Sequence, residues 1–193
     1  MPTTASQAVS PATPSAPVMT AAEFVLRHGG YRVELVNGQV QELPVPFPKH
    51  GIICCTIGYF MGEHVMKHDA GHIMSNDSFV QTRTNPDTLR GADISFYSYE
   101  RLPKGKVPDG LLPVAPDLVV EVRAPSERWG ELFAKVGEYL QAGVRVVIVL
   151  DAPTATASVY RSDELQQIFH NGDALVVPDL FPGFSVPVQR LFE

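Results

Sequence analysis

The chain has 193 residues, enough for one domain with a real core, and its hydrophobic fraction of 45% and charged fraction of 19% are those of a globular protein. A net charge of −6 argues against a dedicated nonspecific nucleic-acid binder, which normally has a basic surface, although acidic metal ligands lower the charge without repelling DNA once an ion is bound. No apolar run approaches the roughly 20 residues that cross a bilayer, and the N-terminus lacks a signal-peptide pattern, so we expect no membrane partner and a cytoplasmic location.

The first residues are rich in Pro, Ala, Ser and Thr and contain almost no large apolar side chains. Such a segment cannot bury enough surface to offset the entropy of ordering. We therefore expect a disordered tail over 1–18 and a single domain over 19–193.

A short helix and a β-hairpin are predicted next. Thr20 and Glu23 have the spacing of a capping box, and Gly29-Gly30 should end the helix that follows. Asn37-Gly38, the strongest short turn signal, then predicts a hairpin over 31–43.

The remaining pattern alternates helices with short apolar strands. Helical spacing predicts a long helix over 50–68 and an amphipathic helix over 131–142. Runs of β-branched and aromatic residues predict strands at 73–74, 79–82, 92–97, 118–123, 144–150, 157–161 and 165–169. This order predicts an α/β fold in which a mixed β-sheet core is flanked by helices.

Two carboxylates interrupt predicted core strands. Glu121 lies within the apolar run Leu118–Val122, where an uncompensated charge would cost on the order of several kcal/mol, so it needs a metal, a cation or a proton. Arg123 should point to the same face of that strand. Asp93 is in a similar position in the strand over 91–97. Two strand carboxylates beside a basic residue favour a divalent metal site of the kind that cleaves phosphodiesters, and a buried ion-pair network is the alternative.

Other candidate clusters are weaker. His64 and His68 lie one helical turn apart, near His72, a spacing that could bind zinc. No glutamate follows His64 and no fourth ligand is evident, so a solvated helix face is favoured. Cysteines that are adjacent in sequence rarely form a disulfide with each other. Cys54 and Cys55 therefore fit a reduced compartment and a buried helix face.

Several short segments follow one another in an order that carries a family resemblance. They are Val33–Gly38, His50, Ala92–Phe96, Ala115–Val122, Lys135 before Tyr139, Ala142–Val144, Val159–Arg161 and Phe181–Phe184. Together they resemble the Uma-two family of putative restriction endonucleases, within the PD-(D/E)xK nuclease superfamily, over roughly 20–192. The resemblance implies a restriction-endonuclease-like fold with an N-terminal helix and a β-hairpin.

The resemblance also implies a set of catalytic residues. Asp93 stands at the aspartate of the "PD" half-motif and Glu121 at the acid of the second half-motif. Lys135, on the following helix, takes the place of the strand lysine of the superfamily. Glu34, at the hairpin acid of the family, and His50, at the start of the long helix, would complete the pocket.

The implied reaction is cleavage of DNA with Mg²⁺ (or Mn²⁺). Asp93, Glu121 and the carbonyl of Val122 would hold the ion. Lys135 would orient or deprotonate the attacking water, in a pocket that depresses its pKa, and Arg123 would bind a phosphate oxygen.

The chain departs from the family pattern at three positions. Ala92 replaces the usual proline before the aspartate, and Arg123 and Ala124 stand where the family has Leu and Ser. Arg123 restores a basic residue at the lysine position of the superfamily, but an arginine stays protonated and cannot act as a general base.

We therefore expect a metal-dependent endodeoxyribonuclease. The alternative is a non-catalytic module that keeps the nuclease fold and acts by dimerisation or partner binding, and RNA is an alternative substrate. Cutting both strands of a duplex commonly needs two active sites, which a homodimer supplies. The apolar stretch 181–188 and the hairpin edge over 31–43 are the candidate dimer surfaces.

Overall fold

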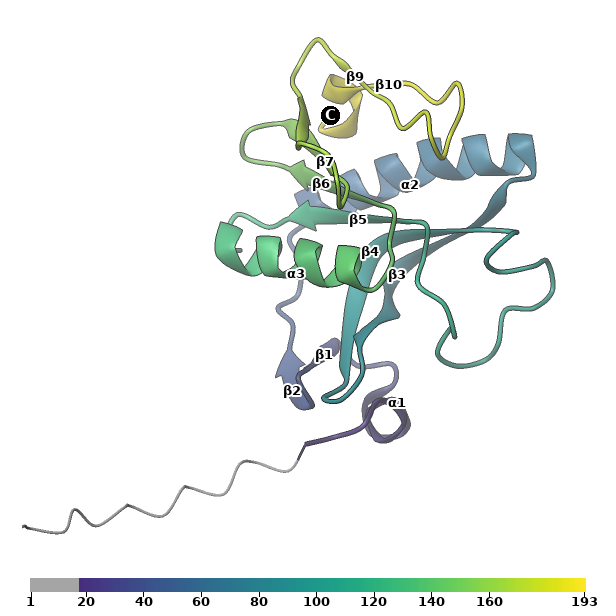
Figure 1. Ribbon diagram of the computed structural model, residues 1–193. Coiled ribbons are helices and arrows are strands. Elements are labelled where there is room, and N and C mark those ends of the chain that lie inside the picture. Colours follow the sequence, from purple (N-terminus) through teal and green to yellow (C-terminus); the bar gives the residue numbers. More distant parts are fainter. Residues whose placement is uncertain (1–17) are drawn as a thin grey trace, which may run out of the picture.

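The computed structural model describes residues 18–193 and is organised around an eight-stranded mixed β-sheet (Figure 1). The strands are β1 (Val33–Val36), β2 (Gln39–Glu42), β3 (Gly71–Arg83), β4 (Thr88–Ser98), β5 (Leu118–Arg123), β6 (Val146–Asp151), β7 (Thr156–Tyr160) and β8 (Gln167–Phe169). Their order is β2-β1-β4-β5-β6-β7-β8, and β3 also pairs with β4. The disordered tail expected over 1–18 lies outside the described residues, apart from Val18.

The N-terminal helix and hairpin form as predicted. In α1 (Ala21–His28), the Thr20 side chain accepts from the backbone of Glu23, and the Glu23 carboxylate accepts from the backbone of Thr20. Asn37 and Gly38 connect β1 to β2 with positive φ angles of 51° and 73°, which the twist of a two-residue hairpin turn requires.

The two long helices cover opposite faces of the sheet (Figure 1). α2 (Pro48–His68) packs on one face and α3 (Trp129–Gln141) on the other. β5 and β6 are the only parallel neighbours among the described strands, and α3 is the crossover between them. Alternation along β5 sends Val120 and Val122 to the α2 face and Val119 to the α3 face, so Glu121 also points toward α3.

The mixed sheet with flanking helices confirms the predicted α/β class, but one segment was divided wrongly. β3 is one strand of 13 residues, not two short strands at 73–74 and 79–82. A bulge at Asn76 and Asp77 shifts its register against β4 without ending the strand. The polar residues of the bulge made the sequence look like a loop.

The C-terminal region forms structure that the sequence pattern did not indicate. A two-stranded sheet of β9 (Ala174–Leu175) and β10 (Val186–Pro187), followed by a 3₁₀ helix (Val188–Leu191), packs with α2 over one face of the main sheet (Figure 1). Phe181 and Phe184 are buried in this layer. The expectation that 181–188 forms a dimer surface is therefore wrong, because its apolar side chains complete the core of this chain.

Two further sequence expectations can be compared with the structure. Cys54 and Cys55 are free thiols, but Cys54 is half-buried and Cys55 is exposed, so they do not share a buried face. Within residues 18–193, no helix has the length and apolar character needed to cross a bilayer.

Candidate active site

A cleft with a volume of about 620 Å³ lies at the end of the sheet where β4 and β5 cease to pair. All seven residues predicted for the site line this cleft: Glu34, His50, Asp93, Glu121, Val122, Arg123 and Lys135. They come from β1, β4, β5, α2 and α3, so the tertiary fold brings together residues that are about 100 positions apart in the chain.

Asp93 lies where the β4–β5 ladder stops. The last paired residues are Ile94 and Val120, and beyond them the carboxylate Oδ2 of Asp93 accepts the backbone N–H of Val122 at 2.7 Å. A side chain thus takes the place of the backbone acceptor that a continued ladder would provide. This contact holds the carboxylate of Asp93, on β4, against β5, the strand that carries Glu121.

The bulge in β3 faces Asp93 from the other edge of β4. Asn76 and Asp77 have φ angles of 67° and 55° and together stand opposite the single residue Asp93. The backbone of Asp77 passes so close to Gly91 that a Cβ there would lie 3.0 Å from the Asp77 Cβ, which explains the glycine. Burial raises the pKa of the Asp77 carboxyl, although Arg32 donates to its Oδ2 at 2.7 Å.

Glu121 is almost completely buried, and two residues of α3 bind its carboxylate. Lys135 Nζ donates to Oε2 at 2.9 Å, and the hydroxyl of Tyr139 donates to Oε1 at 2.7 Å. Lys135 and Tyr139 are four residues apart and so share one helix face. Burial raises the pKa of Glu121 to about 7; Lys135 opposes the shift and Asp93 adds to it.

Lys135 is surrounded by carboxylates. Its Nζ lies 3.4 Å from Oε1 of Glu34 in addition to the bond with Glu121. Burial by itself would lower the pKa of Lys135, but Glu121, Glu34 and Asp93 outweigh it and raise that pKa. A lysine that acts as a general base needs a depressed pKa. The expectation of such a depression for Lys135 is wrong, because its pKa is raised. Lys135 is therefore a cation beside these acids.

Glu34 is buried on β1, not exposed as its alternation with apolar neighbours would suggest. Its Oε1 accepts the backbone N–H of Gly91 at 3.0 Å, and its Oε2 accepts from Arg90 at 2.8 Å. Arg90 in turn makes a bidentate pair with Glu138 of α3, at 2.6 and 2.9 Å. This network ties β1, β4 and α3 together on one side of the cleft.

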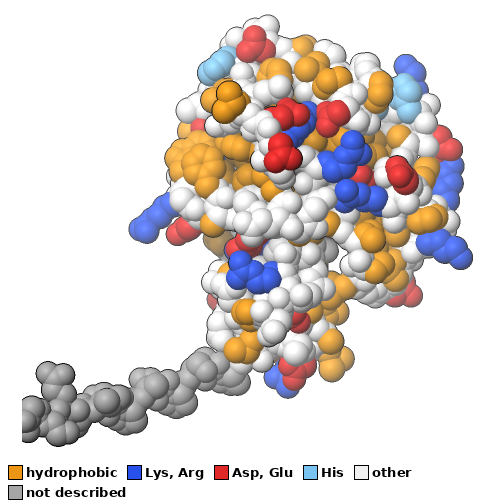
Figure 2. Space-filling model, viewed as in Figure 1, with side chains coloured by type: hydrophobic (Ala, Val, Ile, Leu, Met, Phe, Trp, Pro, Cys, Tyr) orange, Lys and Arg blue, Asp and Glu red, His pale blue; other side chains and the backbone are white. Residues whose placement is uncertain are grey.

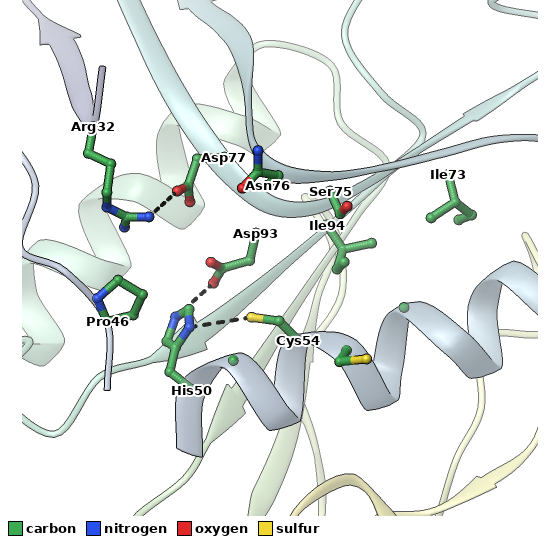
Figure 3. Close-up of a pocket in the computed structure, with 13 residues that line it drawn as sticks. Arg32, Pro46, His50, Cys54, Ile73, Ser75, Asn76, Asp77, Asp93 and Ile94 are labelled. Atoms are coloured by element: carbon green, nitrogen blue, oxygen red, sulfur yellow. Dashed lines mark hydrogen bonds and ion pairs between the residues drawn. The ribbon is translucent and has the colours of Figure 1, made fainter. Parts of the chain in front are cut away.

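His50 projects from the first turn of α2 toward Asp93. Pro48 starts the helix, a position where its missing N–H costs nothing. The Nε2 atom of His50 lies 3.4 Å from Oδ2 of Asp93, and its Nδ1 atom lies 3.4 Å from Sγ of Cys54 (Figure 3). The hydrogen bond with Asp93 raises the pKa of His50 despite burial.

Arg123 reaches the cleft, but its guanidinium is already bound within the chain. Its Nε donates to Asp151 at 2.7 Å, one Nη donates to the carbonyl of Glu127 at 2.9 Å, and the group lies 4.7 Å from the ring centroid of Trp129. These contacts hold the loop that leads into α3. A role for Arg123 in binding phosphate stays a prediction.

Sequence reasoning did not identify several residues of the cleft or its supports: Asp77, Arg90, Glu138, Tyr139 and Asp151. The four-residue spacing from Lys135 was a usable signal for Tyr139. The bulge that turns Asp77 toward the site, and the contact of Arg90 with α3, depend on tertiary packing and have no local signal.

The histidines considered for zinc do not form a site with a third ligand. The rings of His64 and His68 are 4.1 Å apart, and His64 packs against Phe181 and Phe184. In the described part of the chain, His50, Cys54 and Asp93 are the one group of three His, Cys, Asp or Glu side chains whose ligand atoms lie close enough to share an ion.

Comparison with known proteins places this chain in a family. A family model described as "Putative restriction endonuclease" matches residues 21–189, which include all seven predicted site residues. The chain belongs to the Uma2 family. This confirms the resemblance inferred from the sequence, and it is a nuclease family by its description.

A solved structure supports the assignment of the fold. A crystal structure of a protein described as a putative nuclease, from Anabaena variabilis, superimposes on this Uma2 chain with a TM-score of 0.78. The match covers 90% of this chain and 97% of the other at 20% sequence identity, so it establishes a shared restriction-endonuclease-like fold. A comparison with curated proteins gives no significant match.

Proposed function

We propose that the cleft hydrolyses phosphodiester bonds of DNA with the help of Mg²⁺ or Mn²⁺. The observation that supports this most strongly is that Asp93 and Glu121, two largely buried carboxylates on neighbouring strands, line the same cleft where the β4–β5 ladder ends. Membership of the Uma2 family supports a nuclease on independent grounds.

The residues present fit a hard divalent cation. Asp93, Glu121 and the carbonyl of Val122 offer oxygen ligands, the type that Mg²⁺ and Mn²⁺ prefer, and Glu34 could act through a water. Burial, and after it the charge of Asp93, raises the pKa of Glu121 against the effect of Lys135, and a bound cation would favour the ionised carboxylate. When bound, such an ion lowers the pKa of a coordinated water and neutralises charge on the phosphate.

The side chains of the chain itself would position the reactants. Lys135 carries a fixed positive charge in the cleft and can orient a water or a phosphate oxygen by donating an N–H. Tyr139 keeps the Glu121 carboxylate in place, and Glu34 does the same for Lys135. His50, with its raised pKa, can donate a hydrogen bond to the phosphate.

DNA is proposed as the substrate and a homodimer as the working form. On the face shown in Figure 2, acidic and basic side chains are mixed and no continuous basic band appears, which fits a net charge of −6 and weak nonspecific binding. β2 lies at the edge of the main sheet and its side chains are exposed, so this edge strand is the remaining candidate dimer surface.

Single-turnover cleavage of supercoiled plasmid tests the proposal. The wild type should cut in millimolar Mg²⁺ and not in EDTA, and Asp93→Asn should abolish cutting. Asp109→Asn, in an exposed loop away from the cleft, is the matched control and should cut normally. The rate of cleavage of a single-stranded RNA, measured under the same conditions, decides whether RNA is the better substrate.

Thermal unfolding separates a nuclease from a non-catalytic module with the same fold. Mn²⁺ should raise the melting temperature of the wild type, because a ligand that binds only the native state stabilises it, and it should not do so for Asp93→Asn. A folded wild type that neither cuts nucleic acid nor gains stability in Mn²⁺ would favour the non-catalytic module.

A further inference from the structure

A second cleft lies on the other side of Asp93. It has a volume of about 470 Å³ and is formed by the first turns of α2 and by the bulge of β3 (Figure 3). Cys54 and Asp77 line it together with His50 and Asp93. The proposed phosphodiesterase chemistry does not use Cys54.

Three different types of metal ligand converge in this cleft. His50 and Cys54 are four residues apart on α2, so both side chains leave the same face of the helix and meet Asp93 of β4 (Figure 3). A ring nitrogen of His50, the sulfur of Cys54 and a carboxylate oxygen of Asp93 all lie within 4.8 Å of one another. His50 is the central member, at 3.4 Å from the Cys54 sulfur and 3.4 Å from the Asp93 carboxylate.

The two separations of 3.4 Å, one from each ring nitrogen of His50, match the spacing of neighbouring ligands around a tetrahedral ion. Zinc bonds of about 2.0 to 2.3 Å place two ligand atoms about 3.3 to 3.6 Å apart. Only one ring nitrogen of His50 can bind a given ion, so a small side-chain rotation must bring the third donor closer. The cleft of about 470 Å³ leaves room for a fourth, non-protein ligand.

We propose that His50, Cys54 and Asp93 form a binding site for a thiophilic divalent cation, with Zn²⁺ as its best occupant. Sulfur and imidazole ligands favour Zn²⁺ over Mg²⁺, whereas the all-oxygen set around Glu121 favours Mg²⁺. The two sites share Asp93. The proposal of a zinc site does not require nuclease activity. It depends on the proposed function only where Asp93 is a ligand in both sites.

The charges around the cluster suit a cation better than the other chemistry that these residues suggest. A cysteine, a histidine and an aspartate in a row could form a nucleophilic triad. Here the half-buried Cys54 thiol lies in a cleft that is also lined by the carboxylates of Asp93 and Asp77, and this acidic setting disfavours a free thiolate. The same carboxylates attract a divalent cation, and a coordinated thiol loses its proton to the metal.

A consequence follows from the shared carboxylate. A Zn²⁺ ion on Asp93 would compete with Mg²⁺ for the same ligand and place a second positive charge in the adjoining cleft. With Zn²⁺ already bound at micromolar concentration, the further rise in melting temperature on adding Mn²⁺ should therefore be smaller than without Zn²⁺.

Cobalt spectroscopy tests the zinc site without any measurement of cleavage. The full-length apoprotein, in a buffer free of thiols, is titrated with Co²⁺, whose bond to a thiolate gives a near-ultraviolet charge-transfer band. The wild type should show this band at one equivalent, and Zn²⁺ should abolish it by displacement. Surface imidazoles such as His64 and His68 cannot produce the band, because they contribute no sulfur.

Two neighbouring cysteines supply a matched pair of variants. Cys54→Ser should lose the band, and Cys55→Ser, one residue away and outside the cluster, should keep it. Removing a residue that only supports a metal ligand typically costs roughly 10- to 100-fold in affinity. Loss of the ligand His50 in His50→Gln, which keeps the thiol, should lower Zn²⁺ affinity by at least that factor.

The outcomes separate this proposal from the proposed function. Glu121→Gln should keep the band while losing the stabilisation by Mn²⁺, because Glu121 belongs only to the oxygen site. No band in the wild type, a band that survives in Cys54→Ser, or a band that Cys55→Ser removes would overturn the zinc site. None of these results depends on whether the protein cuts DNA.

Discussion

The Nζ atom of Lys135 donates a 2.9 Å hydrogen bond to Oε2 of Glu121, and this contact joins α3 to β5 at the floor of the cleft. Both side chains are largely buried, so the charge of each one offsets the cost of burying the charge of the other. The two most important candidates of the site are therefore also structural partners. Variants at either position must be read for stability as well as for activity.

Removal of the lysine should affect both properties. Lys135→Ala leaves Glu121 and Glu34 without their shared cation, and breaking a buried pair costs about 3 to 5 kcal/mol. Single-turnover cleavage, measured below the reduced melting temperature, should fall about 10²- to 10³-fold. Lys106→Ala, at an exposed loop lysine, should change neither quantity. Normal cleavage by folded Lys135→Ala would remove this lysine from the mechanism.

Arg123 should matter more for stability than for catalysis. Arg123→Leu leaves the buried carboxylate of Asp151 with Thr154 but without its cation, at a cost of about 3 kcal/mol. Chemical denaturation should show this loss, and the double variant Arg123→Leu/Asp151→Asn should recover part of it. Cleavage by the folded single variant should stay close to that of the wild type. A folded but inactive Arg123→Leu would instead identify Arg123 as the working cation.

The raised pKa of Glu121 predicts a pH dependence of stability in EDTA. The folded state holds a proton up to about pH 7, whereas the unfolded carboxyl releases it near 4.5. This contribution is fully present below pH 4.5 and is lost as the pH rises through 7, because the folded state then binds more protons than the unfolded state. Differential scanning calorimetry of wild type and Glu121→Gln should show the difference in this window. Parallel profiles would mean that Glu121 is ionised throughout.

Metal binding should reverse this trend. A cation requires the ionised carboxylate, so the gain in melting temperature on adding Mn²⁺ should grow with pH over the same interval. The same calorimetric series with millimolar Mn²⁺ measures it. A gain that is independent of pH would place the ion on other ligands.

The proposed dimer can be tested at the edge strand. Val40 lies on β2 and is partly exposed, and a lysine there should block edge-to-edge pairing. Light scattering should report a dimer for the wild type and for Val40→Thr, and a monomer for Val40→Lys. A wild type that is monomeric at every concentration would restrict the activity to nicking, the cutting of one strand of a duplex.

Local sequence signals determined much of the fold. The capping box at Thr20, the Asn37-Gly38 turn and the apolar strand around Glu121 act over a few residues, so their structures can be read from neighbours in the chain. Continuous runs of β-branched and aromatic residues likewise indicated which strands lie in the core. The order of motifs indicated the family, and through it Glu34, His50 and Lys135, which are among the residues that line the cleft.

Only the tertiary structure decided what those residues are bound to. The sequence placed Arg123 beside Glu121 on one strand, but parallel pairing of β5 with β6 sets it against Asp151 and commits it to that partner. The pKa of Lys135 is raised because carboxylates from three strands surround it. Charge–charge interactions and burial depend on distance in space, and residues far apart in the chain create both, so no local pattern could specify them.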